Sequence, residues 1–483
     1  MTRPPAAPPS DLLWSAGAFP EDAERRSPNG TAPDRPQRVA IIHDWLVTFA
    51  GAEQVLKELL TLYPHAEIFT LVDFMPTELR QFLGKRRIHT SFLQHFPNAS
   101  KWYRHYLPLM PLAVEQFDLQ GFDLVVSSSH AVAKGVLTGP DQIHVCYCHS
   151  PIRYAWDLQH QYLRESGLTH GPKAWLARWI LHKIRVWDSR TAHGVDGFIA
   201  NSKFIARRVA KAYGRTSRVI HPPVRVETFT PGVGRKDFYL TASRFVPYKR
   251  IPLIVEAFSG MPDKSLVVIG DGPERDRVLA KAGPNVTVLG HEPLEVLRTH
   301  MQQAKAFVFA AEEDFGITPV EAQACGTPVI ALGRGGSTET VLNGRTGILF
   351  EEQTVESIQA AVDRFEARES GFDPRVVRAH ANGFGASRFR AEFDAAVREI
   401  TAEAPLRNIA SESVKSDPDL YGTLGNLGGG EIESVVVRHG PVSKESSEHA
   451  ADDIAVAIAG PENIAPFPVV PEFLSNPQQR RSS

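Results

Sequence analysis

Two glutamates on either side of a glycine turn are the most informative residues of the chain. In the segment EEDFGITPVEAQACGTPVIAL at 312–332, Glu313 follows a strand-like run and Glu321 lies eight residues later. The helix that holds Glu321 is expected to start near Thr318-Pro319, because proline is well placed in a first helical turn. The turn before it would aim backbone N–H groups at an anionic or hydroxyl-rich ligand, and each carboxylate could bind hydroxyls on one part of a nucleotide sugar. The alternative is a helix-start acid, Glu313 or Asp314, followed by a solvated helix carboxylate.

Two cations in the segment SRFVPYKR at 243–250 form a second candidate group. Arg244 offers a planar fork of donors and Lys249 a point charge, and these are the donor types that bind bridging phosphates. Their charge would also stabilise a departing diphosphate without a metal. An exposed basic loop would explain the same residues. Farther along, Gly335-Gly336 precedes a helix start and either permits a close approach of backbone to phosphate or only turns the chain.

The elements that must position these residues occur in two series. Short apolar runs alternate with helical patterns before and after HPPV at 221–224. Val/Ile-rich strands between helices indicate parallel sheets covered on both faces, and two series indicate two doubly wound α/β domains. Ligands bind at the carboxyl ends of such strands, so the site is expected in a cleft between the domains. We predict domains at 38–218 and 219–385, closed by a helix at 386–403.

Composition places the chain among ordinary globular proteins. A chain of 483 residues is too long to fold around one hydrophobic core, and a net charge of −2 lacks the basic excess of a dedicated nucleic-acid binder. Three cysteines favour a reducing compartment, and neither a membrane-spanning run nor a signal-peptide core is evident, so we expect a cytoplasmic protein. A proline-rich leader at 1–37 and an acidic tail at 404–483 are predicted to be disordered. Residues 401–483 carry a net charge of −6, which leaves +4 for residues 1–400.

The ordered motifs of the second half resemble those of family-4 glycosyltransferases, which have the GT-B fold. They comprise Arg244 to Lys249, GDGPE (270–274), Glu313 to Glu321, GTPVI and GG-STETV, and the resemblance covers roughly residues 38–402. It implies two Rossmann-like domains facing across a cleft, a nucleotide-sugar donor and transfer with retention of configuration. It also implies that Arg244 and Lys249 hold the diphosphate and that Glu321 holds the ribose. The implied sugar and base contacts are Glu313, Asp314, the N–H groups of Phe315, Gly316 and Ile317, and the segment around Leu289.

The first half resembles the family more loosely. The segment TFAGAEQV places Gly51 and Glu53 where the family often has Gly-Gly-x-Glu, with Ala50 in place of the first glycine. The resemblance implies that Gly51 lies at the diphosphate and Glu53 on the acceptor side. In YCHSPIRYAWD (147–157), His149 follows a strand where the family often has a histidine near the reacting sugar. This motif most resembles members that use GDP-mannose, so we predict transfer of mannose to a glycan or lipid-linked saccharide.

None of these motifs contains an obvious nucleophile, so we expect attack from the face that the diphosphate leaves, within an ion pair. The predicted catalytic group is Glu313, Lys249, Arg244 and His149, with no metal and no cofactor besides the donor substrate. Other readings are a UDP- or ADP-sugar transferase, a nucleotide-sugar epimerase or a non-catalytic sugar-nucleotide scaffold. A dehydrogenase is disfavoured because Arg275 replaces the third glycine of G-x-G-x-x-G after GDG.

Four weaker signals complete the predictions. Cys146, Cys148 and Cys325 lack further ligands at zinc spacing and are expected to pack in the core. The Asp417-Pro418-Asp419 sequence has a metal-binding pattern but falls in the predicted tail. Two basic-aromatic stretches, 84–107 and 173–187, could contact an anionic membrane at the inner face, or pack at the domain interface.

Overall fold

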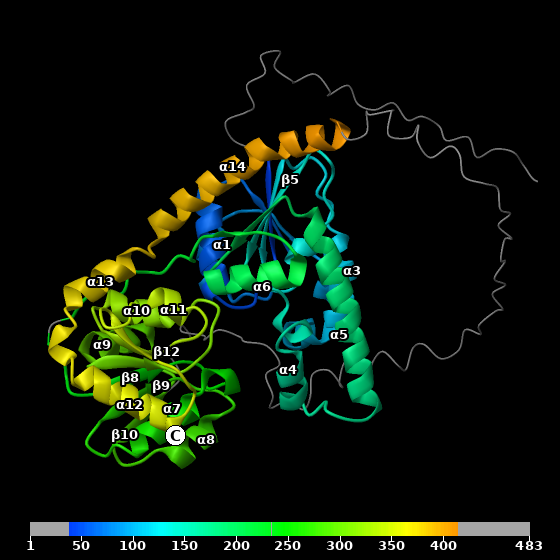
Figure 1. Ribbon diagram of the computed structural model, residues 1–483. Helices are drawn as coiled ribbons and strands as arrows, with labels where there is room; N and C mark the ends of the chain where they lie inside the picture. Colours follow the sequence, from blue (N-terminus) through cyan, green and yellow to red (C-terminus); the bar gives the residue numbers. More distant parts are fainter. Residues whose placement is uncertain (1–37, 233, 414–483) are drawn as a thin grey trace, which may run out of the picture. The chain divides into compact units, whose positions relative to one another are not determined.

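The computed structural model describes residues 38–413 apart from residue 233, with side chains as far as residue 403 (Figure 1). The predicted leader, and the part of the predicted tail beyond 413 with Asp417-Pro418-Asp419, lie outside the described residues. Among the helices of the described part, none combines the length and the hydropathy needed to cross a bilayer.

The first domain contains a parallel sheet of seven strands in the order β3-β2-β1-β4-β5-β6-β7. The strands are β1 (Val39–His43), β2 (Glu67–Thr70), β3 (Ile88–Thr90), β4 (Leu124–Ser129), β5 (Ile143–Cys148), β6 (Gly197–Ala200) and β7 (Arg218–Val219). Its helices are α1 (Gly51–Leu62), α2 (Ala99–Trp102), α3 (Met110–Glu115), α4 (Gln159–Glu165), α5 (Pro172–Thr191) and α6 (Lys203–Tyr213). Short 3-10 turns join them: η1 (Thr77–Leu83), η2 (Phe92–His95), η3 (Tyr103–Leu109), η4 (Ala133–Gly135), η5 (Arg153–Ala155) and η6 (Ala192–Gly194).

The second domain contains a parallel sheet of six strands in the order β10-β9-β8-β11-β12-β13. The strands are β8 (Tyr239–Ala242), β9 (Leu266–Ile269), β10 (Val286–Gly290), β11 (Ala306–Phe309), β12 (Val329–Leu332) and β13 (Gly347–Phe350). Its helices are α7 (Ile251–Ser259), α8 (Arg275–Lys281), α9 (Leu294–Gln303), α10 (Ile317–Ala324), α11 (Ser337–Thr340), α12 (Val355–Glu366) and α13 (Pro374–Asn382), with turns η7 (Pro247–Lys249) and η8 (Glu369–Gly371).

Both sheets are buried on two faces, as their continuous apolar strands predict. In the first sheet Ile42 and Val125 belong to one hydrophobic cluster, whereas Ile41 and Val126 belong to another on the opposite face. Alternate residues of a strand point to opposite faces, so each face has its own layer of helices. The predicted fold class, two doubly wound α/β domains, is confirmed.

Each sheet reverses its strand order once. The reversal falls between β1 and β4 in the first sheet and between β8 and β11 in the second. In open α/β sheets this switch point, at the carboxyl ends of the strands, is where ligands bind. The loops after these four strands carry most of the residues singled out from the sequence.

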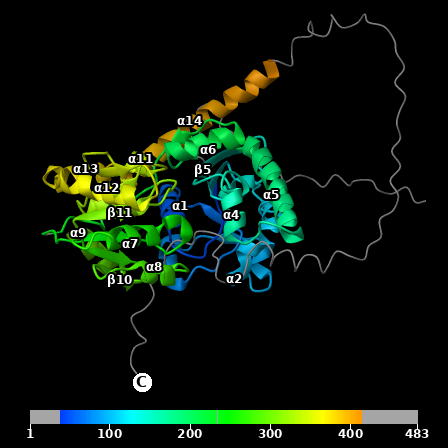
Figure 2. The same cartoon turned by 60° about the horizontal axis from the view of Figure 1, so that its bottom comes forward.

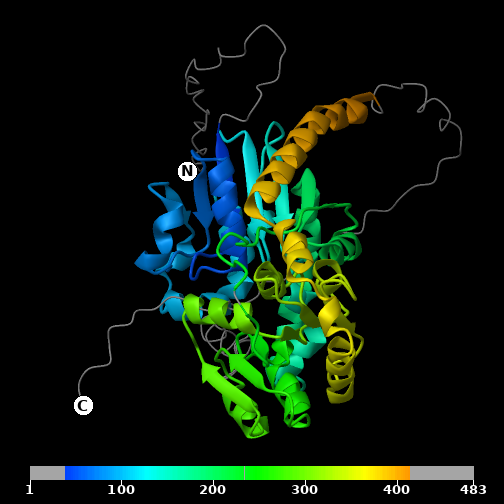
Figure 3. The ribbon, with the colours of Figure 1, turned by 90° about the vertical axis from the view of Figure 1, so that its left-hand side faces the viewer.

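The chain crosses between the domains twice. Near Pro222, Val224 N donates to Phe384 O at 2.9 Å, and Arg388 donates to His221 O at 2.8 Å. After this crossing α14 (Ala386–Ser413) packs beside α1 and the first sheet (Figures 1 and 3). Phe389 and Phe393 of α14 are buried in the same cluster as Ile41, so the C-terminal helix completes the core of the first domain.

Candidate functional site

The cationic loop after β8 and the glutamate loop after β11 meet at the switch point of the second sheet. Lys249 ends η7, and its Nζ forms an ion pair with the carboxylate of Glu313. The ammonium also lies 5.5 Å from the ring centroid of Tyr248 and 5.6 Å from that of Phe309. Both charged side chains stay partly exposed, Lys249 by 14% and Glu313 by 18%. A phosphate entering here would therefore compete with Glu313 for the ammonium.

Arg244 follows β8, and its charge lowers the pKa values of two residues of the first domain. Burial raises the pKa of Tyr103 to about 12, and the charges of Arg104 and Arg244 oppose that rise. Burial lowers the pKa of Arg104, and the charge of Arg244 lowers it further. The charges of Arg244 and Arg104, one from each domain, thus act on each other.

The GDG sequence at 270–272 supports the Arg244 loop. A Cβ added at Gly270 would lie 1.8 Å from Ser243 O, and one added at Gly272 would lie 2.7 Å from Phe245 O. Both glycines also have positive φ, 139° and 151°. Only glycine allows the β9 loop to pack this closely on the backbone that carries Arg244.

The glycine turn before α10 lies on a second glycine turn. Gly316 has a φ of 86°, and α10 begins at Ile317, one residue before the predicted Thr318. Gly336 N donates to Glu313 O at 2.7 Å, and a Cβ at Gly336 would lie 2.3 Å from Phe315 Cα. The Gly335-Gly336 pair packs on the backbone of the Glu313 loop, a role that neither of the two alternatives drawn from the sequence describes.

Glu321 and Leu289 lie on α10 and β10, outside the loops that carry Lys249 and Glu313. Glu321 is buried on α10, and burial raises its pKa although Arg225 Nη2 lies 3.2 Å from Oε1 and opposes the rise. Leu289 is 37% exposed on the outermost strand, β10. The next residue, Gly290, accepts a hydrogen bond from Gly270 N at 2.7 Å, so the end of β10 reaches the same edge of the sheet.

Asp314 connects the two domains. Its carboxylate forms an ion pair with Arg153 of η5 and lies 3.4 Å from Nη1 of Arg208 on α6. The sequence predicts Asp314 as a donor-binding residue, whereas its carboxylate in the structure is engaged by two arginines of the first domain. Its neighbours Glu313 and Phe315 are thereby held against that domain.

A chain of hydrogen bonds joins the predicted acceptor-side residues at the first switch point. Glu53 Oε1 lies 3.4 Å from His43 Nε2, and His43 Nδ1 lies 3.3 Å from Ser128 Oγ. Ser128 Oγ lies 2.9 Å from His149 Nε2. Glu53 also accepts from Ala50 N at 2.8 Å, which caps α1. Burial holds the pKa of His149 well below its usual range, so the imidazole is neutral at pH 7.

The Gly51 loop touches the donor-side turn directly. A Cβ added at Gly51 would lie 2.9 Å from Ile317 Cδ1. Gly51 begins α1 and Ile317 begins α10, so the N-termini of these two helices, one from each domain, lie side by side. Gly51 and Ile317, predicted from opposite halves of the sequence, are thus brought together.

Sequence reasoning missed Asp44, which follows β1 and is fully buried. Its carboxylate accepts four backbone N–H groups at 2.7–3.0 Å, from His130, Ala131, Val132 and Ala133. Burial alone would raise its pKa, but His130, with Nδ1 at 3.0 Å, helps hold the pKa well below its usual range. An aspartate directly after the apolar run VAIIH was the available signal. Lys134 and Asp188 form a buried ion pair that no motif of the sequence indicates.

The cysteines pack as predicted. Cys146, Cys148 and Cys325 are free and buried, and a hydrogen bond with Cys146 together with burial raises the pKa of the Cys148 thiol. Within the described residues no group of three His, Cys, Asp or Glu side chains is arranged to hold a metal ion.

Two Rossmann-like domains with charged loops at their switch points define the GT-B class of glycosyltransferases. Two family models match the chain, Glycosyltransferase Family 4 over residues 50–228 and Glycosyl transferases group 1 over residues 229–383. The two matches adjoin and together cover more than half of the chain. The chain belongs to the family-4 glycosyltransferases, which confirms the resemblance drawn from its motifs.

Curated relatives are distant and matched over part of their length. A GDP-mannose-dependent alpha-(1-6)-phosphatidylinositol monomannoside mannosyltransferase of Mycolicibacterium smegmatis is 31% identical over 40% of this chain and 57% of its own. A D-inositol 3-phosphate glycosyltransferase of Geodermatophilus obscurus is 30% identical over 47% of this chain and 57% of its own. The chain thus spans little more than half the length of these relatives.

Solved structures share the fold. Anabaena HepE in complex with UDP has a TM-score of 0.55 at 16% identity, covering 75% of this chain and 100% of that one. A sucrose-phosphate synthase from Thermosynechococcus elongatus has a TM-score of 0.55 at 19% identity, covering 76% and 99%. At these identities the likeness extends to the architecture alone.

Proposed function

We propose that the protein is a retaining glycosyltransferase that moves a hexose from a nucleotide diphosphate sugar to a glycan or lipid-linked acceptor. The observation that carries the proposal is the meeting of three groups at the carboxyl ends of both sheets: the Lys249–Glu313 pair, the cationic Arg244 loop and the contact of Gly51 with Ile317. A sugar diphosphate needs cations for its phosphates and a carboxylate for its hydroxyls, and these loops supply both.

The proposed mechanism assigns each group one task. Arg244 and Lys249 bind the diphosphate and stabilise its charge as it leaves, which requires neither a metal nor a cofactor. Glu313 orients the sugar hydroxyls with the N–H groups of Phe315 to Ile317, and Glu321 binds the ribose. His149 is partly buried, and its surroundings hold its pKa well below the usual range; it lies near the acceptor, with Glu53 behind it through His43 and Ser128. The acceptor then attacks from the face that the diphosphate leaves, and the departing phosphate takes its proton.

GDP-mannose is the proposed donor. The motif YCHSP-RY-WD supports it, as does the relative named as a GDP-mannose-dependent mannosyltransferase. A UDP-sugar is the competing donor, because structures of this fold are described in complex with UDP and with UDP-glucose.

A donor panel tests the activity and the donor together. The protein is incubated with GDP-mannose, UDP-glucose, UDP-galactose or ADP-glucose, with and without a simple acceptor, and nucleotide release and product anomers are followed by NMR. We expect release and α-linked product from GDP-mannose, unchanged by a chelator. Binding of a sugar nucleotide without release by any donor would favour the scaffold alternative, and inverted product would contradict retention.

The outer stripe of α5 supports contact with an anionic membrane surface that holds a lipid-linked acceptor. Trp175, Trp179 and Val186 are 67%, 48% and 54% exposed, and the ammonium of Lys183 lies 5.5 Å from the Trp179 ring centroid. Figures 1 and 2 show α5 along the margin of the first domain. Asp188, the acidic residue of this helix, is buried, so the exposed stripe is basic and aromatic. The 84–107 stretch, in contrast, is divided among β3, η2, α2 and η3.

Vesicle binding tests the α5 stripe. We expect the protein to co-sediment with vesicles of phosphatidylcholine and phosphatidylglycerol at low salt and to lose binding on Trp175→Ser with Trp179→Ser. Leu279→Ser, which removes an exposed apolar side chain of α8 in the second domain, is the matched control. Equal binding by all three proteins would contradict contact through α5. Such contact would place the protein at the cytoplasmic face of the membrane, consistent with three free cysteines.

A further inference from the structure

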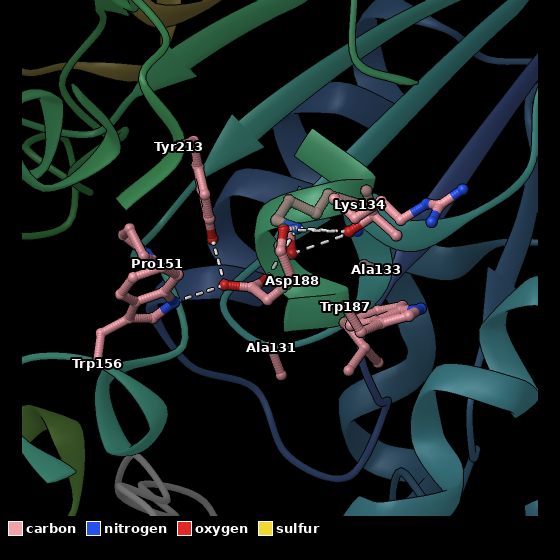
Figure 4. A network of polar contacts seen from close by, with 12 residues as sticks. Ala131, Ala133, Lys134, Pro151, Trp156, Trp187, Asp188 and Tyr213 are labelled. Carbon is pink, nitrogen blue, oxygen red and sulfur yellow. Dashed lines mark hydrogen bonds and ion pairs between the residues drawn. The ribbon is translucent and has the colours of Figure 1, made fainter. Parts of the chain in front are cut away.

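Asp188 on α5 is a buried carboxylate with three side-chain partners (Figure 4). Its Oδ2 accepts hydrogen bonds from Trp156 Nε1 at 2.7 Å and from Tyr213 OH at 3.0 Å. Its Oδ1 forms an ion pair with Lys134 Nζ at 2.8 Å. The three partners come from three separate segments, so one carboxylate joins α5 to η4, to the end of η5 and to α6.

Lys134 is buried with equal completeness. Its ammonium donates to Asp188 O at 2.6 Å and to Thr191 Oγ1 at 2.9 Å, and it forms the ion pair with Asp188 Oδ1. A buried ion pair adds little net stability over well-packed apolar residues, because both charges lose their hydration. What a satisfied pair does supply is a single geometry for the segments it joins.

The first of those segments is the turn at 130–134, which lies between two buried carboxylates. Asp44 accepts the N–H groups of its first four residues, and Asp188 holds the side chain of its last, Lys134. The turn carries His130, whose ring centroid lies 6.2 Å from that of His149 and 6.5 Å from that of His43. Lys134 thus holds the far end of the turn that places an imidazole beside the acceptor-side histidines.

The second segment leads to the donor side. Trp156 directly follows η5, and its backbone N donates to Arg153 O at 3.2 Å. Arg153 forms the ion pair with Asp314, next to Glu313 in the loop before α10. The indole bond to Asp188 therefore holds the short turn that anchors the donor-side loop.

We propose that Asp188 is a positioning residue that sets the acceptor-side turn through Lys134 and the donor-side loop through Trp156. The inference rests on the proposed function, because the two loops are the acceptor and donor sides of that reaction. Asp188 itself touches neither substrate. Its two arms are separable: loss of Lys134 acts on His130, and loss of the indole bond acts on Arg153 and Asp314.

Two substitutions, each removing one donor to the same carboxylate oxygen, distinguish a positioning role from a purely stabilising one. Trp156→Phe and Tyr213→Phe each remove one hydrogen bond to Asp188 Oδ2, but only Trp156 adjoins the Arg153 turn. We expect Trp156→Phe to raise the donor KM about tenfold, the equivalent of one charge-assisted hydrogen bond, with Tyr213→Phe within twofold of the parent. Equal donor KM values for the two variants, at similar melting temperatures, would overturn the donor arm.

The acceptor arm is tested with both charges removed together, which avoids leaving one buried charge unpaired. In Lys134→Met with Asp188→Asn, the amide oxygen can still accept from Trp156 Nε1, which keeps the donor arm in place. We therefore expect this double variant to fold, to keep donor hydrolysis within threefold of the parent, and to lower kcat for transfer to acceptor at least tenfold. Unchanged kcat in the folded double variant would overturn this arm.

A readout without turnover keeps the inference distinct from the proposed function. Histidine ring NMR signals are compared in the parent, the double variant and Tyr213→Phe, with His130→Gln used to assign the His130 signal. We expect the His130 signal to move in the double variant alone. If no donor is turned over by the parent, the proposed function fails, and an unmoved His130 signal would then refute the positioning role separately.

Discussion

The two switch points have the same strand order but opposite chemistry. At the first, between β1 and β4, Asp44 accepts four backbone N–H groups, while Ser128 forms hydrogen bonds with both His43 and His149. At the second, between β8 and β11, Lys249 and Glu313 form one partly exposed ion pair. At the first switch point, backbone N–H groups of the protein already bind the buried carboxylate of Asp44. At the second, the ammonium of Lys249 and the carboxylate of Glu313 stay accessible to a ligand.

This difference suggests a division of labour within one fold. A site that must hold a diphosphate needs charges that can exchange partners, because the ligand replaces an ion pair already present. A site that must present a neutral imidazole needs a surrounding that does not change on ligand binding. The doubly wound sheet supplies the same edge for both, and the loop sequences decide which kind of site forms there.

The largest expected effect comes from removing the cation of the second switch point. Lys249→Ala should lower kcat about a hundredfold, corresponding to about 3 kcal/mol, because one preorganised charge is lost where negative charge develops. Steady-state transfer assays measure it. Lys236→Ala removes an exposed lysine of the same domain and should leave kcat unchanged. A folded Lys249→Ala protein with near-normal transfer would contradict the assignment of the second switch point as the diphosphate site.

Removing the carboxylate charge of the first switch point should act on stability instead. Asp44→Asn places an amide NH₂ where N–H donors now converge, so the free energy of unfolding should fall by about 2 kcal/mol at pH 7. The pKa of Asp44 is held below its unfolded value, so its contribution is present above about pH 4 and is lost as the pH falls toward the folded pKa.

Urea unfolding between pH 7 and pH 3 checks this. The difference between the parent and Asp44→Asn should shrink as the pH falls below about 4. Asp141→Asn, a substitution at an exposed loop aspartate, should follow the parent at every pH. A difference that stays constant through this range would show that the charge of Asp44 is not what stabilises the turn at 130–134.

The contact between the switch points allows a finer test. Gly51→Ala places a methyl group 2.9 Å from Ile317 Cδ1, so the Ile317 side chain at the start of α10 must shift. A cost of about 1 kcal/mol is expected, measured as a roughly fivefold loss in kcat/KM. Ile317→Val removes the clashing methyl and should restore most of the loss in the double variant. An additive loss would indicate that the two helix N-termini do not act together.

The sequence was sufficient for much of this architecture, because buried parallel strands appear as apolar runs and the residues after them lie at one edge of a sheet. Lys249 and Glu313 were predicted as neighbours of one ligand on that ground, and their roles stay a prediction. The side-chain contacts between the two domains could not be predicted from the sequence. Asp314 looks like a helix-start acid until Arg153 and Arg208 are placed beside it, and nothing local to Asp44 shows that its partners lie 86 to 89 residues later.

The smallest expected effect concerns a helix cap that crosses between the domains. Glu339 of α11 accepts the backbone N–H groups of Lys203 and Phe204 at 2.9 and 3.1 Å, at the start of α6, and lies 3.0 Å from His221 Nε2. Burial raises the pKa of Glu339, but His221 and these N–H groups lower it overall. Glu339→Gln should reduce the free energy of unfolding by about 0.5 kcal/mol, because one oxygen remains to accept.

Ser202 provides the matched control, because it caps the same helix from within the first domain, accepting from Ile205 N at 3.1 Å. Ser202→Ala should cost about as much stability as Glu339→Gln, since each removes one cap interaction. Only Glu339→Gln should increase the radius of gyration in small-angle scattering, because only the Glu339 cap links the two domains. An equal radius for both variants would mean that the domains are held together by Asp314 and the α14 crossing without help from α11.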